Sequence, residues 1–511
     1  MPSHSKSVCL ITPPSIFLLD ERVFVNLGIL KVAAVLERSG MAVEMMDLSG
    51  IENFEDAIRD YARNTEIEIF GITSTTPQMP AAAKIARAIR QERPHARIIL
   101  GGPHVTLVHS AYKREMLDCV QGRGTQAMEA VLDLFDVAVV GDGEESIFQA
   151  LGENPPRIVD ANDRNSKFFL NNQRLENLPF PARHLVDLKS YHYTIEEKPA
   201  TSLIAQLGCP FECGFCGGRQ SPMLRVIRTR STQSIIAEMR HIYENYGYTG
   251  FMFYDDELNV NPKMVELMNA ITDLQKELGT EFRLRGFVKA ELFNDLQAEA
   301  MIRAGFRWLL TGFESGSPRI LKNINKKATR DQNTRAIQIA KHHGLKVKAL
   351  MSVGHPGESR ETIMETHDWL LQVKPDDFDV TIITTYPGTP YYDFAQRHPE
   401  KTGVWIYTYE KTGDRLYAYE VDYHEVADYY KGDPDGGYRA YVYTDFLSSE
   451  SLVKMRDFVE RDVRERLNIP FNPGAPSIRY EHSMGQFGAP LPSYILRKSR
   501  SPREVVILRR P

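Results

Sequence analysis

GCPFECGFCGG, residues 208–218, places three of the five cysteines of a 511-residue chain within eight positions. These are Cys209, Cys213 and Cys216. A disulfide would leave one of them over, and a structural zinc site usually takes four protein ligands, whereas no second CxxC pair or His pair follows nearby. Three thiolates on one loop fit a cubane iron–sulfur cluster in which one iron keeps an open coordination position.

Around this loop, strand-like and helix-like stretches alternate. We expect strands at 201–209, 250–257, 281–288, 307–315, 346–354 and 377–390. We expect helices between them at 262–279, 294–305, 329–344 and 359–373. This alternation predicts an α/β fold, a parallel (β/α)6 partial TIM barrel over residues 201–395. In such barrels the chemistry lies at the C-terminal ends of the strands.

The spacing Cys-x-x-x-Cys-x-x-Cys resembles the signature of the radical SAM enzymes. In that family the three thiolates hold a 4Fe–4S cluster, and S-adenosylmethionine (SAM) binds the fourth iron. An electron from the cluster then cleaves SAM and yields a 5′-deoxyadenosyl radical. The resemblance therefore implies that Cys209, Cys213 and Cys216 are the catalytic metal ligands and that Phe215 lies beside the adenine.

Other segments at the expected strand ends resemble the SAM-binding motifs of the same family. YDDE (254–257) takes the place of the family's Gly-Gly-Glu segment, from which it departs, while GFESGS (312–317) and SVGHPGES (352–359) resemble the fourth- and fifth-strand motifs. The resemblance implies SAM contacts for Phe215, Asp255, Asp256, Glu257, Arg285, Glu314, Ser315 and Ser352. An ion pair at the barrel mouth is an equal alternative for Arg285, and a helix N-cap is an alternative for one of residues 255–257.

Residues 1–154 predict a second α/β domain. We expect strands at 7–14, 42–50, 66–76, 96–106 and 136–147, with helices at 25–40, 55–64 and 81–94. Five strands in this arrangement are typical of a doubly wound, Rossmann-like sheet, which binds ligands at the carboxyl ends of its strands. The chain has no GxGxxG motif, so a dinucleotide site of the NAD type is not supported.

Four segments of this domain resemble the cobalamin-binding domain that precedes the barrel in a large class of radical SAM enzymes. They lie at 13–40, 71–76 (GITSTT), 101–104 (GGPH) and 141–145 (GDGEE). The resemblance implies cobalamin contacts at Thr73, Ser74, Thr75, Gly101, Gly102, His104, Gly141, Gly143 and Glu144. The Asp-x-His-x-x-Gly motif, which supplies an axial histidine to cobalt in related domains, is absent, so we expect cobalamin without that ligand. His104 has a plain turn role as its alternative, and some family members keep the domain without the cofactor.

The remaining ranges are predicted from composition. Residues 155–200 are expected to be a linker, and residues 396–511 a small α+β accessory region. Tyrosines recur every few residues from Tyr407 to Tyr443, and they build either a small accessory core or a wall of the substrate pocket. An amphipathic helix is expected at 448–467, with Ser448 or Ser449 as its N-cap.

Composition excludes several classes of protein. A net charge of −5 argues against a generic nucleic-acid binder, and the apolar runs are too short to span a bilayer. No convincing signal peptide precedes the first strand, so we expect a cytoplasmic protein. The resemblance implies a small-molecule substrate and reduced flavodoxin or ferredoxin as electron donor, and it leaves the oligomeric state open.

The leading hypothesis is thus a cobalamin-dependent radical SAM enzyme that methylates an unactivated carbon, or phosphorus, of a small molecule. One alternative is a cyclase or rearrangement enzyme resembling the anaerobic magnesium-protoporphyrin ester cyclase, and another is a radical SAM enzyme whose N-terminal domain no longer binds cobalamin. A methylthiotransferase would need three further cysteines near the N-terminus, where only Cys9 and Cys119 occur. A non-catalytic redox sensor would not need the SAM-like strand ends.

Overall fold

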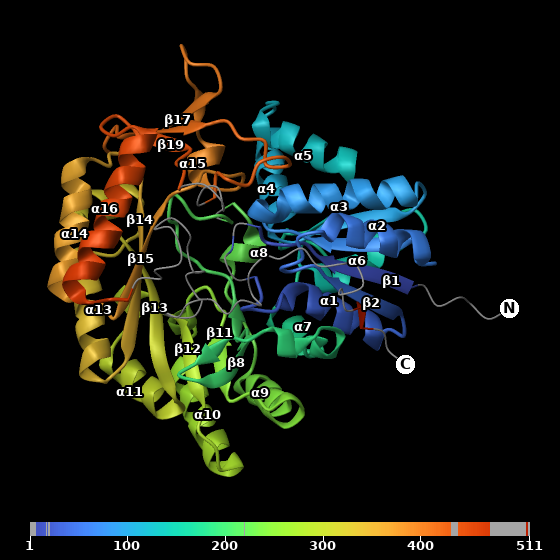
Figure 1. Cartoon of the computed structure of the whole chain (residues 1–511), viewed down its shortest axis with the longest axis horizontal. Coiled ribbons are helices and arrows are strands. Elements are labelled where there is room, and N and C mark those ends of the chain that lie inside the picture. Colours follow the sequence, from blue (N-terminus) through green and yellow to red (C-terminus); the bar gives the residue numbers. More distant parts are fainter. Residues whose placement is uncertain are drawn as a thin grey trace.

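The computed structural model describes residues 7–16, 18, 21–218, 220–430, 438–470 and the backbone of 507–508. An N-terminal α/β unit lies beside a curled sheet with its own helices, and a small C-terminal region packs against both (Figure 1). Of the predicted accessory region 396–511, residues 431–437, 471–506 and 509–511 lie outside the described part. Among the described residues, none of the helices combines the length and apolar character needed to cross a bilayer.

The N-terminal unit is a doubly wound sheet, as predicted. Its strands are β1 (Ser7–Thr12), β2 (Ala42–Asp47), β3 (Ile69–Thr73), β4 (Arg97–Gly101), β5 (Val137–Gly141), β6 (Ile158–Ala161) and β20 (Ile507–Leu508). Its helices are α1 (Leu27–Arg38), α2 (Phe54–Asn64), α3 (Met79–Glu92), α4 (Pro103–Leu117), α5 (Arg123–Leu134) and α6 (Gly143–Ala150). The strands are buried along almost their whole length, since helices cover both faces of the parallel sheet.

The strand order is β20-β2-β1-β3-β4-β5-β6, with β20 antiparallel to β2 and the other pairs parallel. The chain reverses its winding between β1 and β3, and a ligand crevice is expected outside the carboxyl ends of the strands at such a point. Two strands exceed the five that the sequence predicted. One of them, β6, lies inside the range 155–200 that we expected to be a linker, and it extends the sheet beside β5.

The second sheet confirms the predicted partial barrel. It contains β7 (Thr194–Ile195), β8 (Lys198–Leu203), β11 (Gly250–Phe253), β12 (Arg283–Phe287), β13 (Phe306–Glu314), β14 (Lys346–Val353) and β15 (Asp377–Ile382). Its order is β15-β14-β13-β12-β11-β8-β7, and the six longer strands run parallel. The helices between the strands are α9 (Thr232–Tyr246), α10 (Met264–Leu278), α11 (Asp295–Ala304), α12 (Pro318–Asn323), α13 (Arg330–His342) and α14 (Arg360–Val373).

Local sequence signals fix where these helices begin and end. Ser231 caps α9 by accepting the Ser234 amide hydrogen, and Thr329 caps α13 in a reciprocal arrangement with Gln332. Helices α9, α10 and α11 each end at a glycine in the left-handed conformation. Each helix therefore stops at the point where the chain must turn back into the next strand.

The C-terminal region closes one edge of the partial barrel. Its antiparallel sheet contains β16 (Gln396–Arg397), β17 (Val404–Thr408), β18 (Arg415–Tyr419) and β19 (Val442–Thr444). Helix α16 (Ser449–Leu467) follows, with Ser448 as the N-cap, as predicted. It lies alongside β15 and α14 (Figure 1).

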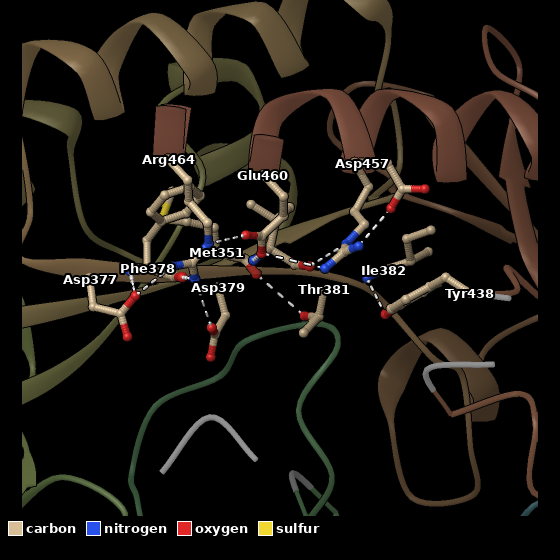
Figure 2. Close-up of polar contacts among 12 residues, drawn as sticks. Met351, Asp377, Phe378, Asp379, Thr381, Ile382, Tyr438, Asp457, Glu460 and Arg464 are labelled. Atoms are coloured by element: carbon tan, nitrogen blue, oxygen red, sulfur yellow. Dashed lines mark hydrogen bonds and ion pairs between the residues drawn. The ribbon is translucent and has the colours of Figure 1, made fainter. Parts of the chain in front are cut away.

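Side chains of α16 take the place of a further strand beside β15 (Figure 2). The Arg456 Nε donates to the Val380 carbonyl at 2.8 Å, and the Glu460 carboxylate accepts the Val380 amide hydrogen at 2.6 Å. The Tyr438 hydroxyl accepts the Ile382 amide hydrogen at 2.9 Å. The backbone groups at the open edge are thereby satisfied without another strand.

Candidate active site

The cysteine loop follows β8 and the short strand β9 (Gln206–Leu207), at the C-terminal end of the barrel. Gly208 has φ +88°, and a Cβ there would collide with the Val226 carbonyl, so the turn into the loop requires glycine. The Cys209 amide donates to the Leu224 carbonyl at 2.9 Å. The Gly214 amide donates to the Ile324 carbonyl at 2.8 Å. These hydrogen bonds hold the start and the middle of the loop against neighbouring segments.

The three thiols lie close enough together to interact electrostatically. Burial raises the pKa of Cys209 to about 11 and also raises the pKa of Cys213 and Cys216, and negative charge on a neighbouring cysteine adds to the shifts of Cys209 and Cys216. Cys216 is accessible to solvent although protein surrounds it. The loop thus presents three clustered thiols that must lose protons when a metal binds.

This donor set fits a cluster. Within the described ranges, no three His, Cys, Asp or Glu side chains converge on a single metal ion. A cubane does not require such convergence, because each of three irons takes one thiolate.

Two of the three carboxylates in the YDDE segment serve the backbone. Asp255 accepts the amide hydrogens of Ala205 and Gln206, and Asp256 accepts that of Gly208 at 3.1 Å. Both therefore brace the entrance to the cysteine loop. Burial raises the pKa of Glu257 to about 7, as it does that of Asp255, but at Glu257 two nearby lysines oppose the shift.

Glu314 is the centre of a polar array at the barrel mouth. It lies at a bulge near the end of β13, in the left-handed conformation with φ +66°, which non-glycine residues seldom adopt. One carboxylate oxygen accepts from the Lys326 ammonium at 3.1 Å, and the other accepts from the Ser352 hydroxyl at 2.8 Å. Such backbone strain is typical of functional positions.

His355 extends this array to the cysteine loop. Its Nε2 lies 2.8 Å from the Ser352 hydroxyl, and its Nδ1 lies 3.3 Å from the Tyr391 hydroxyl. The ring also contacts Phe215 edge-on, with 5.4 Å between the ring centroids. Burial lowers the pKa of His355 to about 3, so the ring is neutral. Phe215 is thus held against the array that contains Glu314.

Two predicted SAM residues have other contacts. The Ser315 hydroxyl lies 3.0 Å from that of Thr366 on α14 and accepts the Ser317 amide hydrogen, so it stabilises the turn after β13. The Arg285 guanidinium donates to the Tyr193 hydroxyl at 3.3 Å and lies 5.7 Å from the Trp308 ring centroid. Arg285 occupies the middle of β12, below the strand ends that carry Glu314 and Ser352.

The predicted cobalamin segments meet at the carboxyl edge of the N-terminal sheet. The Ser74 amide donates to the Gly101 carbonyl, and the His104 amide donates to the Ser74 carbonyl, so the loops after β3 and β4 are joined. The Thr73 hydroxyl lies beside Gly102, which has φ +96°, and a Cβ at Gly102 would lie 2.7 Å from that oxygen. Thr75 forms a capping box with Gln78.

His104 is buried at this edge, with Nδ1 3.2 Å from the Thr76 hydroxyl. Burial lowers the pKa of His104 to about 3, which leaves the imidazole neutral. Gly141, at the end of β5, has φ +87°, and a Cβ there would lie 2.5 Å from the Asn162 nitrogen. The ligand edge is therefore closely packed around backbone that has no room for side chains.

The acidic groups after β5 are compensated. Asp142, between Gly141 and Gly143, pairs with Arg228 at 2.5 Å, and both side chains are buried. Glu144 opens α6 and raises the pKa of Lys31 on α1, although burial lowers that pKa overall. The GDGEE segment thus carries no excess charge toward the ligand edge.

The barrel mouth and this ligand edge face each other. A Cβ at Gly217, in the cysteine loop, would lie 3.2 Å from Leu107 of α4, and one at Gly388 would lie 2.9 Å from the same side chain. The Ser221 hydroxyl donates to Asn162, which follows β6, at 2.5 Å. The barrel mouth and the ligand edge are therefore in direct contact.

The tyrosine-rich part of the chain contributes to a small accessory core, which is one of the two alternatives left open by the sequence. Tyr392, Tyr423 and Tyr429 form a small buried core. Tyr386 lies near Cys216, because negative charge on that thiol adds to the burial that raises the Tyr386 pKa. Tyr254, 39% exposed at the end of β11, interacts in the same way with Tyr430.

Sequence reasoning missed Lys326, Lys289 and His355. Both lysines are buried near the cysteine loop, Lys289 with its ammonium 4.2 Å from the Phe211 ring centroid. The lysines stand outside every motif that we recognised, and only the SVGHPGES segment offered a signal for His355.

Comparison with known proteins adds two family matches. The profile described as the radical SAM superfamily matches residues 203–370, and the profile described as the B12 binding domain matches residues 21–132. The first covers the cysteine loop and the Glu314 array, and the second covers the loops after β3 and β4.

Two curated relatives are similar over about two thirds of the chain. An uncharacterized methyltransferase of Pyrococcus horikoshii is 27% identical over 337 residues, which are 64% of this chain and 69% of that protein. The anaerobic magnesium-protoporphyrin IX monomethyl ester cyclase of Rubrivivax gelatinosus is 24% identical over 361 residues, which are 70% of this chain and 62% of that protein.

Among solved structures, the radical SAM methyltransferase TsrM from Kitasatospora setae, with cobalamin and a [4Fe-4S] cluster bound, has the same fold. The TM-score is 0.62 at 17% identity, over 86% of this chain and 88% of that chain.

Proposed function

Because the chain belongs to the radical SAM enzymes that carry a cobalamin-binding domain, we propose that it is a cobalamin-dependent methyltransferase acting on an unactivated carbon, or phosphorus, of a small molecule. The observation that carries the proposal is the meeting of two sites. The cysteine loop touches α4 through Gly217 and Leu107, so a ligand at each site would lie beside the other.

When bound, a 4Fe–4S cluster would supply the low-potential electron that cleaves SAM, and cobalamin would carry the methyl group. The chain's own residues supply binding and orientation. Cys209, Cys213 and Cys216 would hold the cluster, and Glu257 would accept from the ammonium group of SAM. Glu314 and Ser352 would orient its ribose and carboxylate, and Phe215, held by His355, would lie against its adenine.

The ligand edge of the N-terminal sheet would receive cobalamin through its loops. Gly102 and Gly141 let the loops of this edge pack closely on one another, while Ser74 and Thr75 offer hydroxyl groups. Tyr254, Tyr386 and Tyr430 would exclude water between the two sites. Reduced flavodoxin or ferredoxin would deliver the electron.

The test is anaerobic purification with hydroxocobalamin supplied, followed by cluster reconstitution and analysis of iron and cobalt. We expect about four irons and one cobalt per chain, as one cubane and one cobalamin require. The loaded enzyme should transfer a methyl group from SAM to an accepted substrate. Absence of iron after reconstitution would refute the proposal.

The similarity to the ester cyclase supports a second candidate, a radical cyclisation or rearrangement in the same architecture. Cobalt content distinguishes a cyclase that binds no cobalamin from the cobalamin-dependent methyltransferase. Four irons without cobalt would mean that the N-terminal domain no longer binds cobalamin, and assays for cyclisation would then come first.

A further inference from the structure

Lys326 is buried at the barrel mouth between the Glu314 array and the cysteine loop. Its ammonium lies 3.1 Å from a carboxylate oxygen of Glu314, and its side chain is 8% exposed. It lies in the loop after α12, outside the motifs that the sequence shows. Burying an ammonium group costs free energy unless negative charge nearby compensates it, so the surroundings of Lys326 should be negative.

The backbone around Lys326 is fastened to the cysteine loop. The Gly214 amide donates to the Ile324 carbonyl at 2.8 Å, and the Asn325 side-chain amide donates to the Glu212 carbonyl at 2.9 Å. Asn325 and Lys327, on either side of Lys326, both adopt the left-handed conformation, with φ +55° and +59°. Two such conformations flanking Lys326 indicate that the position of its side chain is closely specified.

The charges around Lys326 are negative and come from three different elements. Although burial lowers its pKa, interactions with Glu314, Cys213 and Glu257 raise the pKa above its ordinary value, so the side chain is protonated. In return, Lys326 opposes the burial that raises the pKa of Cys213, and its effect there is larger than that of Lys289. One cation thus interacts with both the carboxylate array and the metal-ligand loop.

Lys289, the other lysine near the loop, has its own counter-ion. Its ammonium lies 2.7 Å from the Glu291 carboxylate, two residues along the chain. The Glu314 carboxylate, by contrast, is shared between Lys326 and Ser352. Of the two lysines, Lys326 is therefore the one that joins the two halves of the site.

We propose that Lys326 is a positioning residue that stabilises the reduced form of a cluster bound at Cys209, Cys213 and Cys216 while it holds Glu314 in place. The inference rests on the proposed function, because it presumes that the cluster forms. Reduction adds one electron to the cluster from a low-potential donor and breaks no bond. A fixed cation nearby favours the more negative state, so its loss should make the cluster harder to reduce.

The chain provides a matched control in the adjacent lysine. Lys327 is 57% exposed and lies 3.5 Å from Glu212. The experiment compares K326M, K326R and K327M with the unchanged protein, each as the full chain reconstituted anaerobically. Iron and sulfide are counted first, and the reduction potential is then titrated with dithionite and mediators and followed by the electron paramagnetic resonance signal of the reduced cluster.

We expect K326M to shift the potential to a more negative value, K326R to restore most of the shift, and K327M to leave it unchanged. Equal shifts in K326M and K327M, or no shift in either, would overturn the inference. Failure of the unchanged chain to take up iron would instead overturn the proposed function, so the two failures are distinguishable.

A second variant covers the case in which K326M does not retain its cluster. E314Q removes the negative partner and keeps the lysine, so the unbalanced ammonium should shift the potential in the opposite direction, to a less negative value. A shift of E314Q to a more negative value, or no shift, would contradict the proposed role of Lys326.

Discussion

The barrel mouth and the ligand edge of the N-terminal sheet face each other but contain different types of residue. The mouth contains thiols, carboxylates and buried lysines, several with pKa values moved far from their ordinary range. The edge contains glycines, hydroxyl groups and a neutral His104, and its carboxylates are compensated. The mouth is thus a strongly charged site, whereas the edge is a nearly neutral and closely packed one.

The largest expected effect comes from a substitution that disrupts the barrel mouth and leaves the ligand edge intact. Cys213→Ala should abolish the cluster and all production of 5′-deoxyadenosine, because two thiolates cannot replace the three that the site supplies. Cobalamin binding at the edge should persist. Iron analysis and chromatography of the SAM products measure both effects.

Cys119→Ala is the matched control for this change, since Cys119 is an exposed cysteine outside the loop. It should keep four irons per chain. Persistence of 5′-deoxyadenosine in Cys213→Ala would refute the assignment of the loop.

The next largest effect is expected from a substitution that disrupts the ligand edge and leaves the barrel mouth intact. Gly102→Val should weaken cobalamin binding about a hundredfold, or about 3 kcal/mol, because the new side chain would displace the loop at Thr73 and Ser74. Iron content should not change. Titration of the cobalamin absorption spectrum gives the affinity.

Gly40→Val tests whether backbone strain alone explains such a loss. Gly40 also has a positive φ, +84°, but a Cβ there meets nothing within 4 Å. This variant should lose some stability and bind cobalamin normally. Equal weakening in both variants would mean that the edge does not bind cobalamin through this loop.

Between pH 6 and pH 8, SAM affinity at the barrel mouth should change about tenfold, whereas cobalamin affinity at the ligand edge should not. The raised pKa of Glu257, about 7, means that the carboxylate is mostly protonated at pH 6 and mostly ionised at pH 8. If it accepts from the ammonium of SAM, SAM affinity should rise over this range. His104, with a pKa of about 3, stays neutral over this range, so its titration should not change cobalamin affinity.

Equilibrium dialysis of the reconstituted, unreduced protein at both pH values measures these affinities. Glu257→Gln should remove most of the dependence for SAM. If the variant shows the same rise as the unchanged chain, Glu257 is not the group that responds.

The smallest expected effect distinguishes the roles of two serines at the barrel mouth. Ser352→Ala removes the hydrogen bond that orients Glu314 and should weaken SAM binding about fivefold, or about 1 kcal/mol. Ser315→Ala should instead lower the free energy of unfolding by about 1 kcal/mol, because its hydroxyl serves Thr366 and Ser317. Calorimetric titration with SAM and chemical denaturation distinguish them, and the opposite pattern would reverse the roles of the two serines.

The sequence predicted the parts of the molecule that depend on local pattern. Six parallel barrel strands and the five central strands of the N-terminal sheet are recognisable because each contains an apolar run, and helical segments separate most of them. Strands β6 and β20 were missed because they contain only four and two residues, and their pairing with distant strands defines them.

Side-chain direction was the harder part of the site. Glu314 and Ser315 are neighbours in one motif, yet the bulge near the end of β13 directs Glu314 to the mouth and leaves the Ser315 hydroxyl with Thr366. Lys326 comes from a loop whose position depends on its contacts with the cysteine loop. Neither fact is a property of the local sequence.

The pairing of α16 with β15 also limits what other chains can do. An uncovered edge strand is a template on which a strand of a second molecule can add, and such addition leads to aggregation. Here the Val380 amide donates to Glu460 and the Val380 carbonyl accepts from Arg456. Arg464 pairs with Asp377 at 3.1 Å (Figure 2). An incoming strand would have to displace several buried, mutually paired charges, so the last strand of the barrel is protected from intermolecular pairing.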